Sequence, residues 1–178
     1  MKNKKPVILA ITGGISLTSY NRKILNTLKV NYKLTCDMTI YDEIIRFPFF
    51  DSGISEEGTP DIIKEFLGEV KRADGILICS PEYVFSIPGV LKNALEWAVS
   101  SVVFTDKPVA VITAASVGQK AHESLLLVLK TIGAKLTDDT SLLISGVKGK
   151  VSLEGEICDE ETDIALQNLM HSFLESIS

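Results

Sequence analysis

The side chains best suited to chemistry lie in three polar stretches, each of which directly follows an apolar run. The first spans residues 12–21 and reads TGGISLTSYN. Glycines expose backbone N–H groups, and the start of a helix carries partial positive charge, so this stretch favours an anion such as a phosphate. It has neither the lysine-containing P-loop pattern nor the GxGxxG spacing. A polar turn that only caps a helix is the alternative interpretation.

The second and third stretches suit a flat ring rather than an anion. In residues 80–98, Pro81 and Pro88 restrict the backbone, and the aromatic residues Tyr83 and Phe85 lie between them. Aromatic side chains beside exposed N–H groups suit a heteroaromatic ligand, although they equally suit a core or a subunit contact. The third stretch, residues 113–124, is small and polar. This composition alone is weak evidence for a binding site, and it gains weight because the stretch is expected to lie beside the other two.

The elements that must position these stretches alternate along the whole chain. Strands are predicted at 6–12, within 33–41, at 73–80, at 108–116 and within 136–144, and helices at 19–30, 61–72, 87–101, 120–134 and 159–177. Ser19 is the predicted N-cap of the first helix, and Gly133 the predicted C-cap glycine of the fourth. Residues 47–60 read as a long irregular connection.

This alternation predicts an α/β domain over residues 1–178, a doubly wound five-stranded parallel sheet with helices on both faces. The expected strand order is 2-1-3-4-5. In such sheets ligands bind at the carboxyl ends of the strands near the switch point, which brings together the stretches after Thr12, Ser80 and Thr113.

The composition excludes several classes of protein. A net charge of −5 argues against a nucleic-acid partner. No apolar run reaches the roughly 20 residues of a membrane span or forms a signal peptide, so we expect a soluble cytoplasmic protein. The three cysteines and two histidines lack metal-ligand spacing, so no metal is expected. No GxSxG or Cys/His pattern nominates a catalytic residue.

Within the second stretch, Pro81-Glu82-Tyr83 is followed at residues 86–97 by SIPGVLKNALEW. This pattern resembles that of the NADPH-dependent FMN reductase family, the flavodoxin-like quinone, azo-dye and chromate reductases. The resemblance extends to FPFFD, ADGILICSPEY and LKTIGAKL. It implies bound FMN, NADPH or NADH as co-substrate, a small-molecule electron acceptor such as a quinone or azo compound, and a homodimer or homotetramer.

The resemblance also implies which residues bind the cofactor. The phosphate would be held by Gly14, Ser16, Ser19 and Asn21, the ring by Pro81, Glu82, Tyr83 and Val84, and the other edge of the ring by Ser116 and Gly118. In the family's first stretch an arginine stands where this chain has Ser16, and a serine where it has Gly14. A charge-assisted hydrogen bond contributes about 1.5–3 kcal/mol, so its loss weakens FMN binding unless another cation compensates. Arg22 and Lys23 are adjacent, but the first helical turn allows them to point away.

Two other functions are compatible with the same stretches. The missing arginine favours a flavin-binding or regulatory module with weak or no reductase activity. A hydrolase or glycosyl transferase would need a carboxylate nucleophile, for which Glu82 is the one candidate in these stretches.

Overall fold

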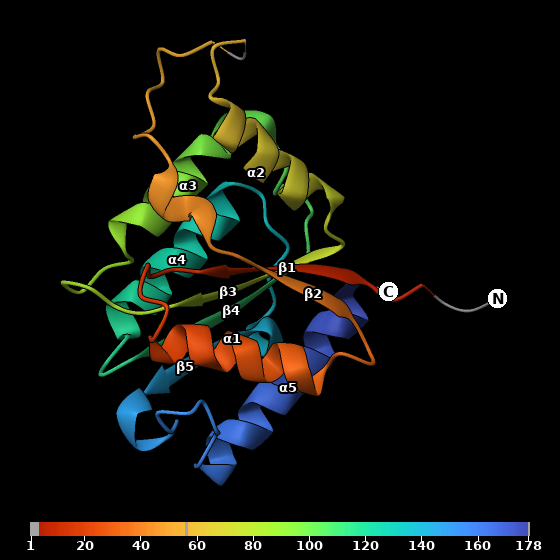
Figure 1. The fold of residues 1–178 in the computed structure, drawn as a ribbon, viewed down its shortest axis with the longest axis vertical. Helices are drawn as coiled ribbons and strands as arrows, with labels where there is room; N and C mark the ends of the chain where they lie inside the picture. The colour runs from red at the N-terminus through yellow and green to blue at the C-terminus, as the bar shows by residue number, and fades with distance from the viewer. Residues whose placement is uncertain (1–3, 56, 178) are drawn as a thin grey trace.

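The sheet has five parallel strands in the order β2-β1-β3-β4-β5, as predicted (Figure 1). The computed structural model describes residues 4–55 and 57–177, so residues 1–3, 56 and 178 of the predicted domain lie outside the described residues. The strands are β1 (Val7–Thr12), β2 (Asp37–Tyr41), β3 (Gly75–Ser80), β4 (Val109–Ala115) and β5 (Ser141–Ser145). Because β1 pairs with both β2 and β3, the switch point lies between β1 and β3.

Helices cover both faces of this sheet (Figure 1). The α-helices are α1 (Tyr20–Asn31), α2 (Asp61–Arg72), α3 (Gly89–Trp97), α4 (Gln119–Thr131) and α5 (Glu160–Ile177). The described residues also form four short 3₁₀ helices: η1 (Glu43–Arg46), η2 (Val99–Ser101), η3 (Asp138–Thr140) and η4 (Val147–Gly149). Leu9 and Ile11 of β1 join the core under α2, α3 and α4, whereas Ile8 and Ala10 join the core under α1 and α5. Successive strand residues point to opposite faces, so burial on both sides requires the continuous apolar run seen in the sequence.

The α3 helix is shorter than the predicted span of 87–101. The helix begins after Pro88 and ends at Trp97, where the chain changes from an α-helix to the 3₁₀ helix η2. The N–H of Ala98 bonds to the carbonyl of Leu95 at 3.2 Å, a spacing of three residues, and Val102 then takes a left-handed φ of 49°. The apolar pattern of the sequence continues past Trp97, but the α-helical backbone ends there.

The end of α4 follows its sequence signal. Gly133 has a φ of +85°, and its N–H bonds to the carbonyl of Lys130 at 3.1 Å. The N–H of Ala134 reaches the carbonyl of Leu129 at 3.0 Å, which completes a Schellman motif. The predicted C-cap glycine is confirmed, although the helix ends three residues before the predicted 134.

The long connection over residues 47–60 is anchored to α3. Asn93 accepts a hydrogen bond from the N–H of Phe50 at 2.8 Å and donates to the carbonyl of Pro48 at 3.0 Å. The indole N–H of Trp97 donates to the same carbonyl at 2.9 Å, and its ring meets Phe50 edge-on with centroids 5.2 Å apart. Trp97 therefore serves packing.

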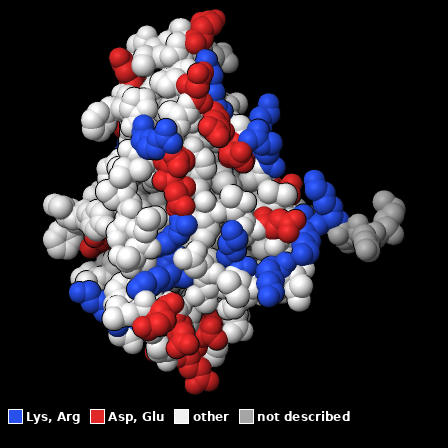
Figure 2. All heavy atoms as spheres, in the orientation of Figure 1, with Lys and Arg blue, Asp and Glu red and all other residues white. Residues whose placement is uncertain are grey.

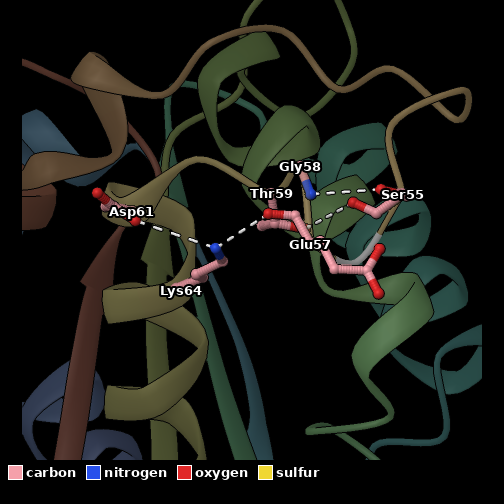
Figure 3. A network of polar contacts seen from close by, with 6 residues as sticks. All are labelled: Ser55, Glu57, Gly58, Thr59, Asp61 and Lys64. Atoms are coloured by element: carbon pink, nitrogen blue, oxygen red, sulfur yellow. Dashed lines mark hydrogen bonds and ion pairs between the residues drawn. The ribbon is translucent and has the colours of Figure 1, made fainter.

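The tip of this connection is tied to the start of α2 (Figure 3). Lys64 donates to the carbonyl of Glu57 at 3.3 Å and lies 4.0 Å from the carboxylate of Asp61. The N–H of Gly58 donates to the hydroxyl of Ser55 at 3.3 Å. These contacts tie the end of the connection to the first turn of α2.

Charges of both signs are mixed over the face drawn in Figure 2. Acidic side chains gather at its lower end. The first turn of α5 carries Glu160, Glu161 and Asp163, and negative charge at a helix N-terminus is stabilising.

Candidate functional site

The first and second polar stretches are in direct contact where β1 and β3 end. The N–H of Gly13 donates to the carbonyl of Cys79 at 2.8 Å. A Cβ placed on Gly13 would lie 2.6 Å from the Cβ of Ser80 and 2.9 Å from its Cα, which is closer than packed carbon atoms approach. Only glycine permits this approach, so Gly13 fixes how the two stretches meet.

The first stretch leads into α1 through the predicted cap. The hydroxyl of Ser19 accepts a hydrogen bond from the N–H of Arg22 at 3.2 Å, which confirms Ser19 as the N-cap. The hydroxyls of Ser16 and Thr18 are 3.2 Å apart, and both residues are exposed at the start of the helix. Hydroxyl groups and helical N–H groups are thus available together at one surface.

Asn21 lies inside the protein rather than at that surface. Its Nδ2 donates to the carbonyl of Ala114 at 3.1 Å, and its Oδ1 accepts from the thiol of Cys79 at 3.3 Å. Burial raises the pKa of that thiol well above its usual range. Both ends of the Asn21 amide are engaged in joining α1 to β3 and β4. The predicted contact between this side chain and a phosphate is therefore replaced by a structural role.

A small hollow opens beside Gly14 and Ser16, between the first stretch and the residues that follow β2. Its volume is about 20 Å³, room for roughly one water molecule. Thr12 lines it and is only 4% exposed, and within the described residues its hydroxyl has no hydrogen-bond partner. Arg22 and Asp42 line the same hollow and form an ion pair. Buried hydroxyls are normally satisfied, so an unpaired one marks a place for an additional partner.

The second stretch turns sharply at Val84 and Phe85. Tyr83 and Ser86 exchange two backbone hydrogen bonds, of 2.9 and 3.0 Å, which closes a two-residue turn. The turn puts Val84 at a φ of 51° and Phe85 at 54°, a region that costs non-glycine residues about 1–3 kcal/mol each. Val84 is 96% exposed and Phe85 71% exposed, so no packing of their side chains offsets this cost. Such strain is concentrated at functional sites.

Glu82 joins the second stretch to the third. Its carboxylate accepts a hydrogen bond of 3.1 Å from the N–H of Ala121, in the first turn of α4. Gly118 is the N-cap of α4, has a φ of +88°, and offers no side-chain acceptor. Glu82 therefore acts as the cap from a distance. A carboxylate committed to a helix terminus is poorly suited to act as a nucleophile, which argues against the hydrolase alternative.

The third stretch is held from the side of β5. The carbonyl of Ser116 accepts from the N–H of Gly146 at 3.1 Å, and the carbonyl of Val117 accepts from the hydroxyl of Ser145 at 2.6 Å. Ser116 itself is exposed. The three predicted stretches thus lie at one edge of the sheet, connected through Gly13 and Glu82.

Comparison of the chain with known protein families shows what kind of protein has this arrangement. The model of the family described as NADPH-dependent FMN reductase matches residues 6–148. This chain belongs to that family. The reductase therefore uses FMN with a nicotinamide co-substrate, and it is an oxidoreductase of the flavodoxin-like fold.

Curated relatives of the reductase cover nearly the whole chain. A quinone reductase of Escherichia coli is 25% identical over 98% of this chain and 97% of its own length. An NADH:(hydroxy)cinnamate reductase subunit of Vibrio ruber is 29% identical over 93% and 84%. The NADH-dependent flavin reductase subunit 2 of Lactobacillus johnsonii is 29% identical over 96% of both chains.

A solved structure supports the fold. The flavoenzyme NAD(P)H:(acceptor) oxidoreductase of Paracoccus denitrificans superposes with a TM-score of 0.78, covering 97% of each chain at 21% identity.

Four residues of the reductase's strand-end region were not predicted as site residues: Thr12, Arg22, Asp42 and His122. Thr12 ends β1 and Asp42 directly follows β2, so their place at strand ends was a usable signal. His122 lies in the first turn of α4, and its Nδ1 is 2.9 Å from the hydroxyl of Thr113. Burial lowers the pKa of His122 below its usual 6.5.

Two features are absent from the described residues of the reductase. No group of three His, Cys, Asp or Glu side chains there is placed to hold a metal ion. No helix among residues 4–55 and 57–177 is long and apolar enough to cross a membrane.

Proposed function

We propose that this protein is a quinone reductase that passes electrons from NADPH or NADH, through FMN held at the three strand-end stretches, to a small acceptor. The observation that carries the proposal is the convergence of these stretches beside the unpaired hydroxyl of Thr12. The names of the E. coli and V. ruber relatives support acceptors that are small conjugated carbonyl compounds.

The first stretch fits the phosphate of FMN. Thr12 has a buried hydroxyl without a partner in the described part of the chain, and Gly14 has no Cβ to fill the space facing Pro81 and Tyr83. The first turn of α1 supplies N–H groups and partial positive charge. In this proposal Gly14, Ser16 and Ser19 hold the phosphate, and Asn21 contributes only its backbone.

The second and third stretches would hold the ring. Backbone groups of Pro81, Glu82, Tyr83 and Val84 line one edge, and Ser116 and Gly118 the other. Bound FMN supplies the redox chemistry, since it accepts a hydride from the nicotinamide and passes electrons on. N–H groups fixed by the strained turn stabilise negative charge on a reduced ring without rearranging. No side chain of the protein is assigned as a proton donor.

The exposed aromatic residues support a quinone as the acceptor. Tyr83 and Phe85 leave the second stretch open to solvent, and a flat quinone stacks favourably on aromatic rings. We expect the protein to serve several quinones, because an open site discriminates weakly by shape.

Turnover with a quinone tests this function. The protein is loaded with FMN, and NADPH oxidation is followed with menadione and then with an azo dye. Menadione-dependent oxidation above that of free FMN supports the proposal. Stoichiometric FMN binding without turnover on any acceptor contradicts it and favours the regulatory module that Ser16, in place of an arginine, suggested.

A further inference from the structure

The first polar stretch carries no charged side chain between Gly13 and Asn21. A phosphate dianion placed there would have hydroxyls and N–H groups but no cation from the stretch itself. The next residue, Arg22, lies on the first turn of α1 and lines the hollow together with Gly14 and Ser16. Its side chain is only 18% exposed and is paired with Asp42, which lines the same hollow, so it is packed against the protein and not extended into solvent.

Thr12 also lines this hollow, and its buried hydroxyl has no hydrogen-bond partner within the described residues. Nη1 of Arg22 is in direct contact with a carboxylate oxygen of Asp42, so the charge of the guanidinium is already paired. A phosphate oxygen that reaches the hollow would accept a hydrogen bond from the Thr12 hydroxyl and would bind Arg22 in exchange for Asp42.

Lys23, the neighbouring cation, is turned elsewhere. Its ammonium group lies over the ring of Tyr20, 5.4 Å from the centroid, and it does not line the hollow. Of the two adjacent cations, Arg22 alone is placed to serve a phosphate at the first stretch.

We propose that Arg22 supplies the cation for the FMN phosphate and that Asp42 competes with the phosphate for it. This inference rests on the proposed function, since it concerns the same site. Asp42 holds the guanidinium at the hollow when no phosphate is bound. When the phosphate arrives, the guanidinium exchanges one oxyanion for another, and the remaining carboxylate repels the dianion.

Flavin affinity tests this assignment, because FMN and riboflavin differ only in the phosphate. Flavin-free protein is titrated with each flavin, and binding is followed by quenching of flavin fluorescence. The variants are R22Q, R22K, D42N and, as a matched control for loss of one positive charge on the same helical turn, K23Q. Thermal melting of each variant reports whether it folds.

In R22Q we expect FMN affinity to fall about ten-fold or more, the loss of one charge-assisted hydrogen bond, while riboflavin affinity stays unchanged. R22K keeps a positive charge and should retain most of the preference for FMN. D42N should bind FMN more tightly than the unaltered protein. K23Q should match the unaltered protein with both flavins.

R22Q and D42N break the same ion pair. If the pair were purely structural, the two variants would have the same effect, whereas this proposal expects opposite effects on FMN affinity. Equal weakening of FMN and riboflavin in both R22Q and D42N overturns it, as does an unchanged FMN affinity in R22Q. An unchanged FMN affinity in D42N overturns the competition. Failure of the unaltered protein to bind either flavin instead overturns the proposed function.

Discussion

The carboxylate of Glu82 accepts a hydrogen bond of 3.1 Å from the backbone N–H of Ala121, 39 residues further along the chain. This contact joins the loop after β3 to the first turn of α4, where Gly118 offers no cap of its own. A carboxylate at a helix N-terminus satisfies an unpaired N–H group and interacts favourably with the helix dipole. Two of the three polar stretches are therefore held in one arrangement by a single side chain.

Removing this contact should destabilise the protein. We expect E82A to lower the free energy of unfolding by about 1 kcal/mol, the usual effect of losing a helix cap. E82Q keeps a carbonyl acceptor and should lose less. Urea unfolding of both variants measures the difference. If E82A unfolds at the same urea concentration as the unaltered protein, the contact does not contribute to stability.

Gly13 should tolerate no side chain. In G13A the new Cβ would overlap Ser80, including its backbone Cα, so we expect a loss of about 1–3 kcal/mol of unfolding free energy. G89A is the matched control, because a Cβ on Gly89 meets nothing within 4 Å and lies at the start of α3. It should be neutral or stabilising by up to about 1 kcal/mol. Equal stability of the two variants contradicts the close approach of β1 and β3.

Relieving the strained turn should stabilise the protein. Asparagine adopts the left-handed region more readily than valine, so V84N should raise the free energy of unfolding by about 1 kcal/mol. The Val84 side chain is almost fully exposed, so no packing is lost. V30N, at an exposed position of α1, is the control and should change stability by less than about 0.5 kcal/mol. A destabilised V84N would contradict the assignment of backbone strain to Val84.

Stability should fall below neutral pH because of His122. Burial lowers its pKa in the folded protein below 6.5, with a smaller opposing effect from Glu123, so the unfolded chain binds the proton more readily. The contribution of neutral, buried His122 to the free energy of unfolding is fully present above pH 6.5. It is lost as the pH falls from 6.5 through the pKa of His122 in the folded protein. Urea unfolding at several pH values should show a shallower loss for H122N. H171N, which alters the exposed histidine, should retain the full dependence.

The sequence predicts best what is decided locally. The buried run of β1, the Ser19 cap and the Gly133 terminus all depend on neighbouring residues and are confirmed. Strand and helix alternation predicts a doubly wound parallel sheet, and the expected order 2-1-3-4-5 is confirmed. That order brings the polar stretches to one edge of the sheet.

The sequence pattern does not show which side chains contact residues far away in the chain. The sequence predicts Asn21 as a phosphate-binding residue at the start of a helix, yet its amide donates to the carbonyl of Ala114, 93 positions away. Arg22 is predicted only as a neighbour of the first stretch, because its orientation depends on Asp42 beyond β2. The strain at Val84 is likewise invisible, since valine is not a residue that sequence rules place at a positive φ.

The account depends most directly on FMN-dependent electron transfer by this chain. The decisive measurement is NADPH oxidation with menadione as the protein is titrated with FMN. We predict that the rate rises with FMN and saturates at one FMN per chain, well above the rate with FMN alone. A rate that never exceeds that of free FMN, at any FMN concentration, would contradict the account.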